Sequence, residues 1–271
     1  MELIRGFVIR IFSIFFTVLI FSVIISTISF ISELFSSKEK NVTNNDVKVL
    51  SFTFSNKHFW NDNYSRNHYG NFKVNNIDVN SSYKNKISKN PQTWKQLYNQ
   101  IYFHDKNKLT EILNVYKSIY NSGNYNKKEF ADIIVSSVQY IPYILTVDGN
   151  CSILYKNDRD VRDMINDGIK CKSDIYAGLF TPLEFMKYFE GDCDTRTLFI
   201  FTILKHFGYD VKILNSDLYG HSIIGLNLPS RGSYKTFQGK RYYTWETTSK
   251  YWELGDIPPE TSNMNYWYVE L

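Results

Sequence analysis

A long apolar run lies near the start of the chain. Residues 11–32 carry no charge and are dominated by Ile, Phe, Val and Leu. A helix that crosses a bilayer needs about 20 such residues, whereas the apolar core of a cleaved signal peptide usually has about 7–15. No small-x-small cleavage site follows, because the chain continues as Glu33-Leu34-Phe35. The pattern predicts an uncleaved transmembrane anchor over residues 1–35.

Positive charges flank this run almost evenly. Arg5 and Arg10 precede it, and Lys38 and Lys40 follow it. A short N-terminal tail with two arginines favours a cytoplasmic N-terminus. We therefore expect a single-pass protein of the cytoplasmic (inner) membrane, with its bulk on the extracytoplasmic side and the membrane as a partner of the N-terminal helix.

A polar stretch over residues 36–92 follows, rich in Asn, Ser and Lys. We interpret it as a stalk or accessory region. His58 and His68 fall in it without partners at metal-ligand spacing, so we expect both on the surface.

Helical spacing of apolar residues begins near Trp94. Ile112, Val115 and Ile119 mark one helix, which Ser122-Gly123 ends, and a second runs from about residue 130 to residue 138. Pro142 predicts that this second helix ends near residues 139–141.

Two helix starts have clear local signals. Thr181-Pro182-Leu183-Glu184 combines an N-cap, a proline at the first helical position and a capping box, and this short helix should end at Gly191. Gly191-Asp192 then opens a helix from Cys193 to about His206, which Gly208 stops. Apolar residues over 198–204 cover most of its circumference, so it should be buried.

Three strand-like segments follow, over residues 209–214, 221–228 and 241–248. Pro229 to Lys240 is a turn region, so the second and third segments should pair as a long hairpin. Helices followed by an antiparallel sheet predict an α+β domain over residues 93–271, in which the helix that begins at Cys193 packs on the sheet.

The order of Cys193, His221 and Glu246 suggests nucleophilic catalysis by a thiol. Backbone N–H groups and the helix dipole at the start of a helix stabilise a thiolate, so we expect one at neutral pH. His221 would take the thiol proton and Glu246 would hold the imidazole in its useful tautomer. As alternatives, each residue has an ordinary structural role: a small core residue, a strand histidine and a solvent-facing glutamate.

Gln139 is the candidate for an oxyanion hole, together with the backbone N–H of Cys193. An ordinary polar residue at a helix end is the alternative. Asp192 and Asp194 should serve the helix start electrostatically, with Arg196 paired to one of them.

The chain contains three cysteines, and one interpretation pairs Cys151 with Cys171 and leaves Cys193 free. A disulfide fits an extracytoplasmic compartment, and two unrelated buried thiols are the alternative. Trp245 and Tyr219 flank the candidate residues, either as walls of a cleft or as structural aromatics.

Other classes of function have little support in the sequence. The formal net charge is only +4 and the lysines are scattered, so no nucleic-acid partner is predicted. A zinc site built from Cys193, His221 and Glu246 lacks a fourth ligand and any Cys-x-x-Cys or His-x-x-x-His spacing. The chain has no glycine-rich phosphate loop and no dinucleotide fingerprint, and no metal or cofactor is predicted.

Residues 128–257 resemble the transglutaminase-like superfamily, the papain-related group that includes bacterial transglutaminase-like cysteine proteinases. The matching segments are Gly191-Asp192-Cys193, Tyr219-Gly220-His221-Ser222, Trp245-Glu246-Thr247-Thr248 and Val138-Gln139-Tyr140-Ile141-Pro142-Tyr143. The family's acid is more often Asp, so Glu246 is a departure that keeps the charge.

The resemblance implies that the thiolate attacks a carboxamide or peptide carbonyl and forms a thioester acyl-enzyme. We therefore expect a membrane-anchored cysteine peptidase or amide hydrolase that acts on a protein or peptide substrate. The alternatives are an acyl-transferring protein cross-linker, and a catalytically silent binding or assembly module on the same fold. The expected fold class is α+β, with an N-terminal transmembrane helix before a papain-like or transglutaminase-like core.

Overall fold

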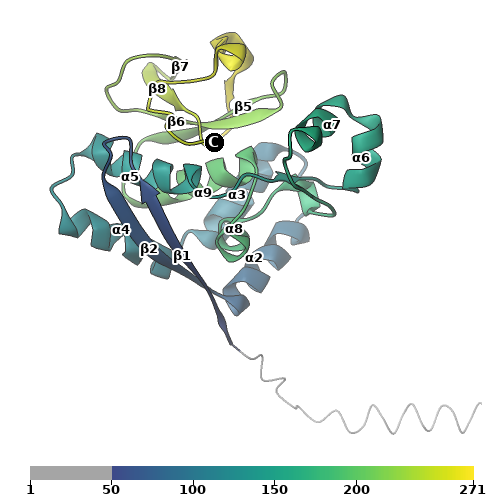
Figure 1. The fold of residues 1–271 in the computed structure, drawn as a ribbon, viewed down its shortest axis with the longest axis horizontal. Helices are drawn as coiled ribbons and strands as arrows, with labels where there is room; N and C mark the ends of the chain where they lie inside the picture. The colour runs from purple at the N-terminus through teal and green to yellow at the C-terminus, as the bar shows by residue number, and fades with distance from the viewer. Residues whose placement is uncertain (1–50) are drawn as a thin grey trace, which may run out of the picture. The chain divides into compact units, whose positions relative to one another are not determined.

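An antiparallel sheet with a buried helix against it organises the protein, as a computed structural model shows for the residues it describes, 51–271 (Figure 1). The strand order is β7-β8-β6-β5-β9, and every neighbouring pair is antiparallel. The strands are β5 (Val211–Ser216), β6 (His221–Leu226), β7 (Tyr234–Phe237), β8 (Lys240–Trp245) and β9 (Tyr268–Val269).

The predicted pairing of the second and third segments is confirmed, with one difference. Ile224 lies opposite Trp245 in the antiparallel pair β6–β8. The connection between these strands is not a plain turn, because part of it forms β7, which pairs with the outer edge of β8. The tight hairpin is therefore β7–β8.

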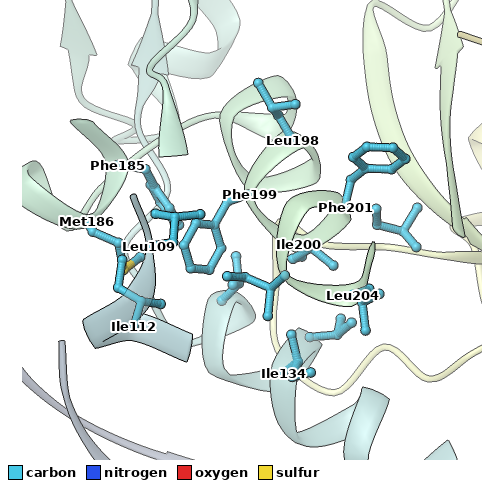
Figure 2. Close-up of a cluster of buried hydrophobic side chains, with 14 of the residues drawn as sticks. Leu109, Ile112, Ile134, Phe185, Met186, Leu198, Phe199, Ile200, Phe201 and Leu204 are labelled. Carbon is cyan, nitrogen blue, oxygen red and sulfur yellow. The ribbon is translucent and has the colours of Figure 1, made fainter. Parts of the chain in front are cut away.

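The buried helix is α9 (Cys193–His206), and it contacts the central strand β6 and its neighbour β5. Its Leu198, Phe199, Ile200 and Leu204 have no exposed surface. Figure 2 shows these side chains among apolar residues from neighbouring helices. Fully burying one such side chain stabilises a fold by about 1.5–3 kcal/mol, so the position of α9 is strongly determined.

The remaining helices lie before α9 in the chain, and the predicted helix signals are confirmed. The helix that ends at Ser122 is present, and the next one ends at Gln139. Both bonds of the Thr181–Glu184 capping box form, although this helix ends at Tyr188, earlier than expected. The helices are α2 (Asn76–Ser88), α3 (Trp94–Asp105), α4 (Thr110–Ser122), α5 (Lys127–Gln139), α6 (Cys151–Asn157), α7 (Arg159–Asn166) and α8 (Pro182–Tyr188), with 3₁₀ turns at Tyr176–Gly178, Pro259–Thr261 and Met264–Tyr266.

The segment expected to be a stalk is largely folded. Strands β1 (Thr53–Asn61) and β2 (Asn67–Asn75) form an antiparallel hairpin that contacts α4, α5 and α8. Ser51–Leu271 is one compact unit, so the boundary predicted between residues 92 and 93 falls inside it. The expectation that His58 and His68 lie on the surface is wrong, because both are buried: His58 Nε2 bonds the Ser137 carbonyl and His68 Nε2 bonds Asp62.

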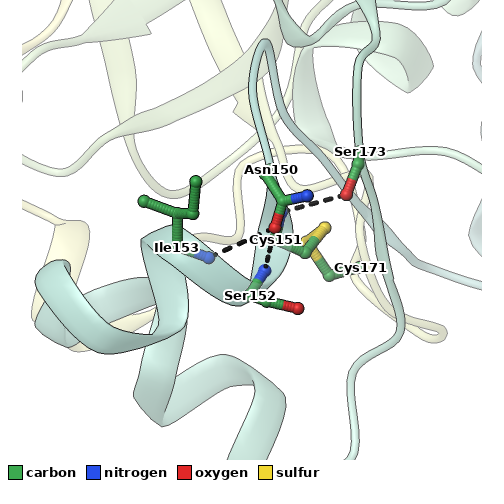
Figure 3. The surroundings of a disulfide bond; sticks show 6 residues. All are labelled: Asn150, Cys151, Ser152, Ile153, Cys171 and Ser173. Carbon is green, nitrogen blue, oxygen red and sulfur yellow. Dashed lines mark hydrogen bonds between the residues drawn. A yellow bond between two sulfur atoms is a disulfide. The ribbon is translucent and has the colours of Figure 1, made fainter.

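A disulfide cross-links the segment between α5 and α8, which contains two short helices and two short strands. Cys151, the first residue of α6, is bonded to Cys171 in β4 (Cys171–Lys172), as one interpretation of the sequence predicted (Figure 3). Strand β4 pairs in parallel with β3 (Leu145–Thr146). The disulfide therefore joins the start of α6 to β4, the strand that precedes α8 and α9 in the chain.

The predicted fold class is wrong as stated, because it begins with a transmembrane helix. No helix among residues 51–271 is long and apolar enough to cross a membrane. The apolar run over residues 11–32, which carried that expectation, lies outside the described residues. The fold class that the structure supports is α+β, with the Cys193 helix packed on an antiparallel sheet.

Candidate active site

Cys193 is the first residue of α9, and its neighbours fix the start of the helix. The Asp192 side chain accepts a hydrogen bond from the Thr195 backbone N–H at 3.0 Å and so caps the helix. A Cβ at Gly191 would lie 2.7 Å from Thr195 Cγ2 and 3.0 Å from Phe185 Cδ2, so only glycine fits there. The Gly-Asp-Cys sequence is therefore a packing requirement as well as a cap.

His221 begins β6, and its ring is held by Glu246. The Nε2 atom lies 2.8 Å from Glu246 Oε2, and the imidazole is mostly buried. The Trp267 ring lies edge-on to it at 6.0 Å. Because Glu246 occupies Nε2, Nδ1 is the ring nitrogen that can take up a proton.

Glu246 follows directly after β8, and hydrogen bonds hold its carboxylate on both oxygens. While Oε2 meets His221, Oε1 accepts from the backbone N–H groups of Thr247 and Thr248 and from the Thr248 hydroxyl, at 2.7–2.9 Å. Continuing the β6–β8 register by one pair sets Glu246 opposite Ile223, so His221 is its diagonal neighbour on the same face. His221 and Glu246 therefore meet as diagonal neighbours across the β6–β8 pair.

The peptide between His221 and Ser222 brings these two residues to the start of α9. The Ser222 backbone N–H donates to the sulfur of Cys193. The Ser222 carbonyl accepts from the Thr197 hydroxyl, one turn further along α9, at 3.1 Å. The three residues predicted as a triad are therefore gathered in one place.

Gln139 does not occupy the position predicted for it. Its amide nitrogen donates to the Glu246 carbonyl at 2.8 Å and to the Trp252 carbonyl at 3.1 Å. Both of its N–H bonds are therefore used, and neither is free to meet an oxyanion beside Cys193. The amide holds the chain that follows β8, because it binds two carbonyls there.

Arg196 does not pair with Asp192 or Asp194 as expected. Its fully buried guanidinium donates to four backbone carbonyls at 2.6–3.2 Å. The acceptors come from the end of α5 and the residues after it, from the turn before Cys193 and from the chain after Glu246: Val138, Ile141, Gly191 and Thr247. One side chain thus joins the three segments that meet at the site.

The environment of the sulfur differs from the prediction. Burial and the carboxylates of Asp194 and Asp192 raise the pKa of the Cys193 thiol well above its usual value, and the Ser222 N–H only partly opposes them. The shift opposes the thiolate that the sequence predicted, and burial of the sulfur is its largest cause. A raised thiol pKa favours the neutral form of Cys193.

The histidine and glutamate have opposite shifts. Burial alone lowers the pKa of His221, but the hydrogen bond and charge of Glu246, with Asp194 and Asp192, raise it above 6.5 overall. Burial raises the pKa of Glu246, but the hydrogen bond and charge of His221 and the bonds from Thr248 bring it down to about 2. Glu246 therefore stabilises a positive charge on the His221 imidazole when the ring takes up a proton.

The flanking aromatics have different roles. Trp245 is a core residue that donates its indole N–H to the Trp252 carbonyl, so it is structural. Tyr219 packs against Trp267 and Tyr266, next to the His221 ring.

Sequence reasoning missed the polar residues behind the sulfur. Tyr98 on α3 and Asn215 on β5 are buried there, together with the Ser222 side chain. An asparagine and a serine within an apolar strand pattern were the available signal for Asn215 and Ser222, and Tyr98 had none. Among residues 51–271 no group of three or more His, Cys, Asp or Glu side chains is placed to hold a metal ion, so the zinc alternative gains no support.

No protein-family model, curated protein or solved structure matches the chain. The resemblance to the transglutaminase-like superfamily therefore stays a prediction. Inference about function rests on the geometry of Cys193, His221 and Glu246 alone.

Proposed function

We propose that the protein is a thiol-dependent amide hydrolase that cleaves carboxamide or peptide bonds in a protein or peptide substrate. The observation that carries this proposal is the pair His221–Glu246, joined at 2.8 Å and placed at the start of the helix that begins with the free Cys193. A paired imidazole beside a thiol on the first turn of a rigid helix suits nucleophilic catalysis.

Attack would begin with transfer of the thiol proton to His221 Nδ1 as the sulfur bonds the carbonyl carbon. Glu246 remains a carboxylate throughout and stabilises the imidazolium, which suits its depressed pKa. The backbone N–H of Cys193, at the start of α9, is a donor suited to the oxyanion.

Collapse of the tetrahedral intermediate would break the C–N bond, and the His221 imidazolium would protonate the leaving amine. The product of this half is a thioester on Cys193. Water then attacks the thioester, His221 takes its proton, and the carboxylic acid leaves as the thiol re-forms. If an amine attacked instead of water, the same site would transfer the acyl group.

The test is a trapped acyl-enzyme. The full-length protein is incubated with a peptide mixture, quenched in acid and analysed by intact-mass and peptide mass spectrometry. We expect an acyl adduct on Cys193, release of peptide fragments, and loss of both in Cys193→Ala. In His221→Ala the acylation rate should fall by about 10²–10⁴.

Three results would contradict the proposal. Hydrolysis that survives in Cys193→Ala would exclude the thiol as nucleophile. Absence of any adduct and any fragment in the wild-type protein would favour a silent binding module. Incorporation of a labelled primary amine into a glutamine peptide, faster than its hydrolysis, would replace the hydrolase by the acyl-transfer alternative.

A further inference from the structure

A second carboxylate lies beside the sulfur and has no part in the proposed triad. The Cys193 thiol donates to Asp194 Oδ2 at 3.9 Å. The other oxygen, Oδ1, accepts from the phenol of Tyr98 at 2.6 Å. Asp194 therefore meets the nucleophile with one oxygen and the protein interior with the other.

Residues from three other elements hold Asp194 in this place. Tyr98 comes from α3, and the Asn215 side chain on β5 bonds the same phenol. The Ser222 hydroxyl on β6 donates to Asn215 Oδ1 at 2.9 Å and lies near Asp194, whose pKa it lowers. The Tyr98 hydrogen bond, itself supported by side chains from β5 and β6, fixes the direction of the Asp194 carboxylate.

The charged and titratable groups around the sulfur are mostly acidic. They come from α3, the segment after α5, the start of α9, β6 and the end of β8: Tyr98, Tyr143, Asp192, Asp194, Arg196, His221 and Glu246. Arg196 is the cation, but four of its five N–H groups bond backbone carbonyls. Asp194 is the only carboxylate in this set for which a hydrogen bond from the thiol is present.

Asp194 affects Cys193 and His221 in opposite ways: it disfavours charge on the thiol and favours charge on the imidazole. Its charge opposes a negative sulfur, and the same charge favours a positive imidazole on His221. A thiolate formed in advance is therefore disfavoured, whereas an imidazolium formed during attack is stabilised.

We propose that Asp194 is a positioning residue that holds Cys193 as a neutral thiol at rest, so that its proton leaves only as the substrate carbonyl is attacked. This inference rests on the proposed function, since the S–H proton passes to His221 Nδ1 while the C–S bond forms. Burial raises the pKa of Asp194, while the Tyr98 phenol and the charge of His221 favour its carboxylate form, and Asp194 takes no proton in this step.

The experiment measures the pH dependence of Cys193 alkylation by iodoacetamide in the full-length protein. Asp194→Asn keeps the size of the side chain and removes the charge. We expect the midpoint of alkylation to fall by about one pH unit or more, which corresponds to about a tenfold faster reaction near neutral pH. Asp163→Asn, on the exposed face of α7, is the matched control and should not move the midpoint.

A second readout separates electrostatics from a loss of structure. The acid limb of amide hydrolysis, which reports His221, should also move to lower pH in Asp194→Asn, and Asp194→Glu should restore both curves toward the wild type. Near-UV circular dichroism checks the fold, and Asp194→Ser is the second variant if Asn disturbs it.

An alkylation midpoint that stays unchanged, or rises, in a folded Asp194→Asn protein would overturn the inference. That failure is distinguishable from failure of the proposed function. If the wild type hydrolyses substrate and the two alkylation curves coincide, only the role of Asp194 is wrong. If alkylation shifts as expected but no substrate is ever acylated, the hydrolase proposal is wrong and the thiol–carboxylate contact remains.

Discussion

Two of the three histidine–carboxylate pairs among residues 51–271 look alike and differ in what surrounds them. His221 Nε2 meets Glu246 at 2.8 Å, and His104 Nδ1 meets the buried Asp105 at 2.7 Å. The other ring nitrogen of His104, Nε2, lies 3.2 Å from the Ser81 hydroxyl, a group of the kind that serves as a nucleophile in hydrolases. By residue type and distance alone, the second cluster is a serine–histidine–aspartate array.

A lysine separates the two cases. The Lys108 ammonium lies 2.8 Å from His104 Nε2 and 2.8 Å from Ser81 Oγ, so it occupies the nitrogen that would have to accept the hydroxyl proton. Ser81 also lies inside α2, where backbone N–H groups are used within the helix, whereas Cys193 begins α9. Under the proposed function, a histidine–carboxylate pair serves catalysis only if one ring nitrogen is free and backbone N–H groups beside the attacking atom are unused.

The sharpest way to break this comparison is to remove each nucleophile. Cys193→Ala should lower amide hydrolysis by at least about 10³, because the bond-forming atom is gone. Ser81→Ala should leave it within about twofold. The steady-state rate of product release measures the activity of both variants, and circular dichroism checks that they fold. A folded but inactive Ser81→Ala protein would contradict the expectation that only Cys193 is needed for hydrolysis.

Replacing Glu246 should lower turnover, whereas replacing Asp105 should lower the stability of the fold. Glu246→Gln places an amide N–H against Nε2, so the remaining ring proton moves to Nδ1, the nitrogen that must accept one; turnover should fall by about 10²–10⁴. Asp105→Asn should instead lower the free energy of unfolding by about 1–3 kcal/mol, since buried partners lose an acceptor, with turnover retained. Urea unfolding and initial rates on both variants decide this, and equal losses of turnover would refute it.

Gln139 distinguishes a positioning role from the oxyanion role that the sequence suggested. Gln139→Leu leaves two buried carbonyls, of Glu246 and Trp252, without their donor, and turnover should fall about tenfold with the pH profile unchanged. A direct oxyanion donor would cost about 10²–10³ in kcat. A loss in that higher range, with normal stability, would restore the original prediction.

The pH dependence of stability should show the His221–Glu246 pair. The pKa of Glu246 is depressed to about 2 from 4.5, so its contribution is present above pH 4.5 and is lost as pH falls through about 2. The pKa of His221 is raised above 6.5, so its contribution is present below pH 6.5 and is lost as pH rises through the folded value. Urea unfolding of wild type and His221→Ala across this range should differ most between these limits, and parallel curves would contradict the linkage.

The smallest expected effect concerns Asp192. Burial and the Asp194 charge raise its pKa to about 7 from 3.8, so the favourable contribution is present below pH 3.8 and is lost as pH rises through about 7. Asp192→Asn keeps a good helix cap and removes that titration. The variant should therefore gain stability relative to the wild type from low to neutral pH, which thermal unfolding at a series of pH values measures.

Local signals predicted much of this molecule, and long-range contacts explain what they missed. The capping box at Thr181 and the Gly191-Asp192 start of α9 follow from short-range rules, so both could be predicted. The β1–β2 hairpin was mistaken for a stalk because only alternate residues, such as Trp60 and Phe72, are apolar within a polar composition.

The sequence was enough to predict which residues form the candidate site, but not the protonation state or the hydrogen bonds of their side chains. The order of Cys193, His221 and Glu246 was enough to expect them together. The state of the thiol depends on Asp194, whose partner Tyr98 lies 96 positions away in the sequence. The direction of the Gln139 amide likewise depends on carbonyls more than 100 positions away, at Glu246 and Trp252.

Arg196 makes the assembly of the site an all-or-none event. Its four carbonyl partners belong to segments that meet only in the finished fold, and a buried guanidinium without them is costly. A partly folded chain, with α5 or the end of β8 undocked, therefore cannot hold the nucleophile and the histidine in register. Amide hydrolysis at Cys193 should vanish in the same cooperative denaturant transition as the tertiary structure, so a chain that has not finished folding carries no working site.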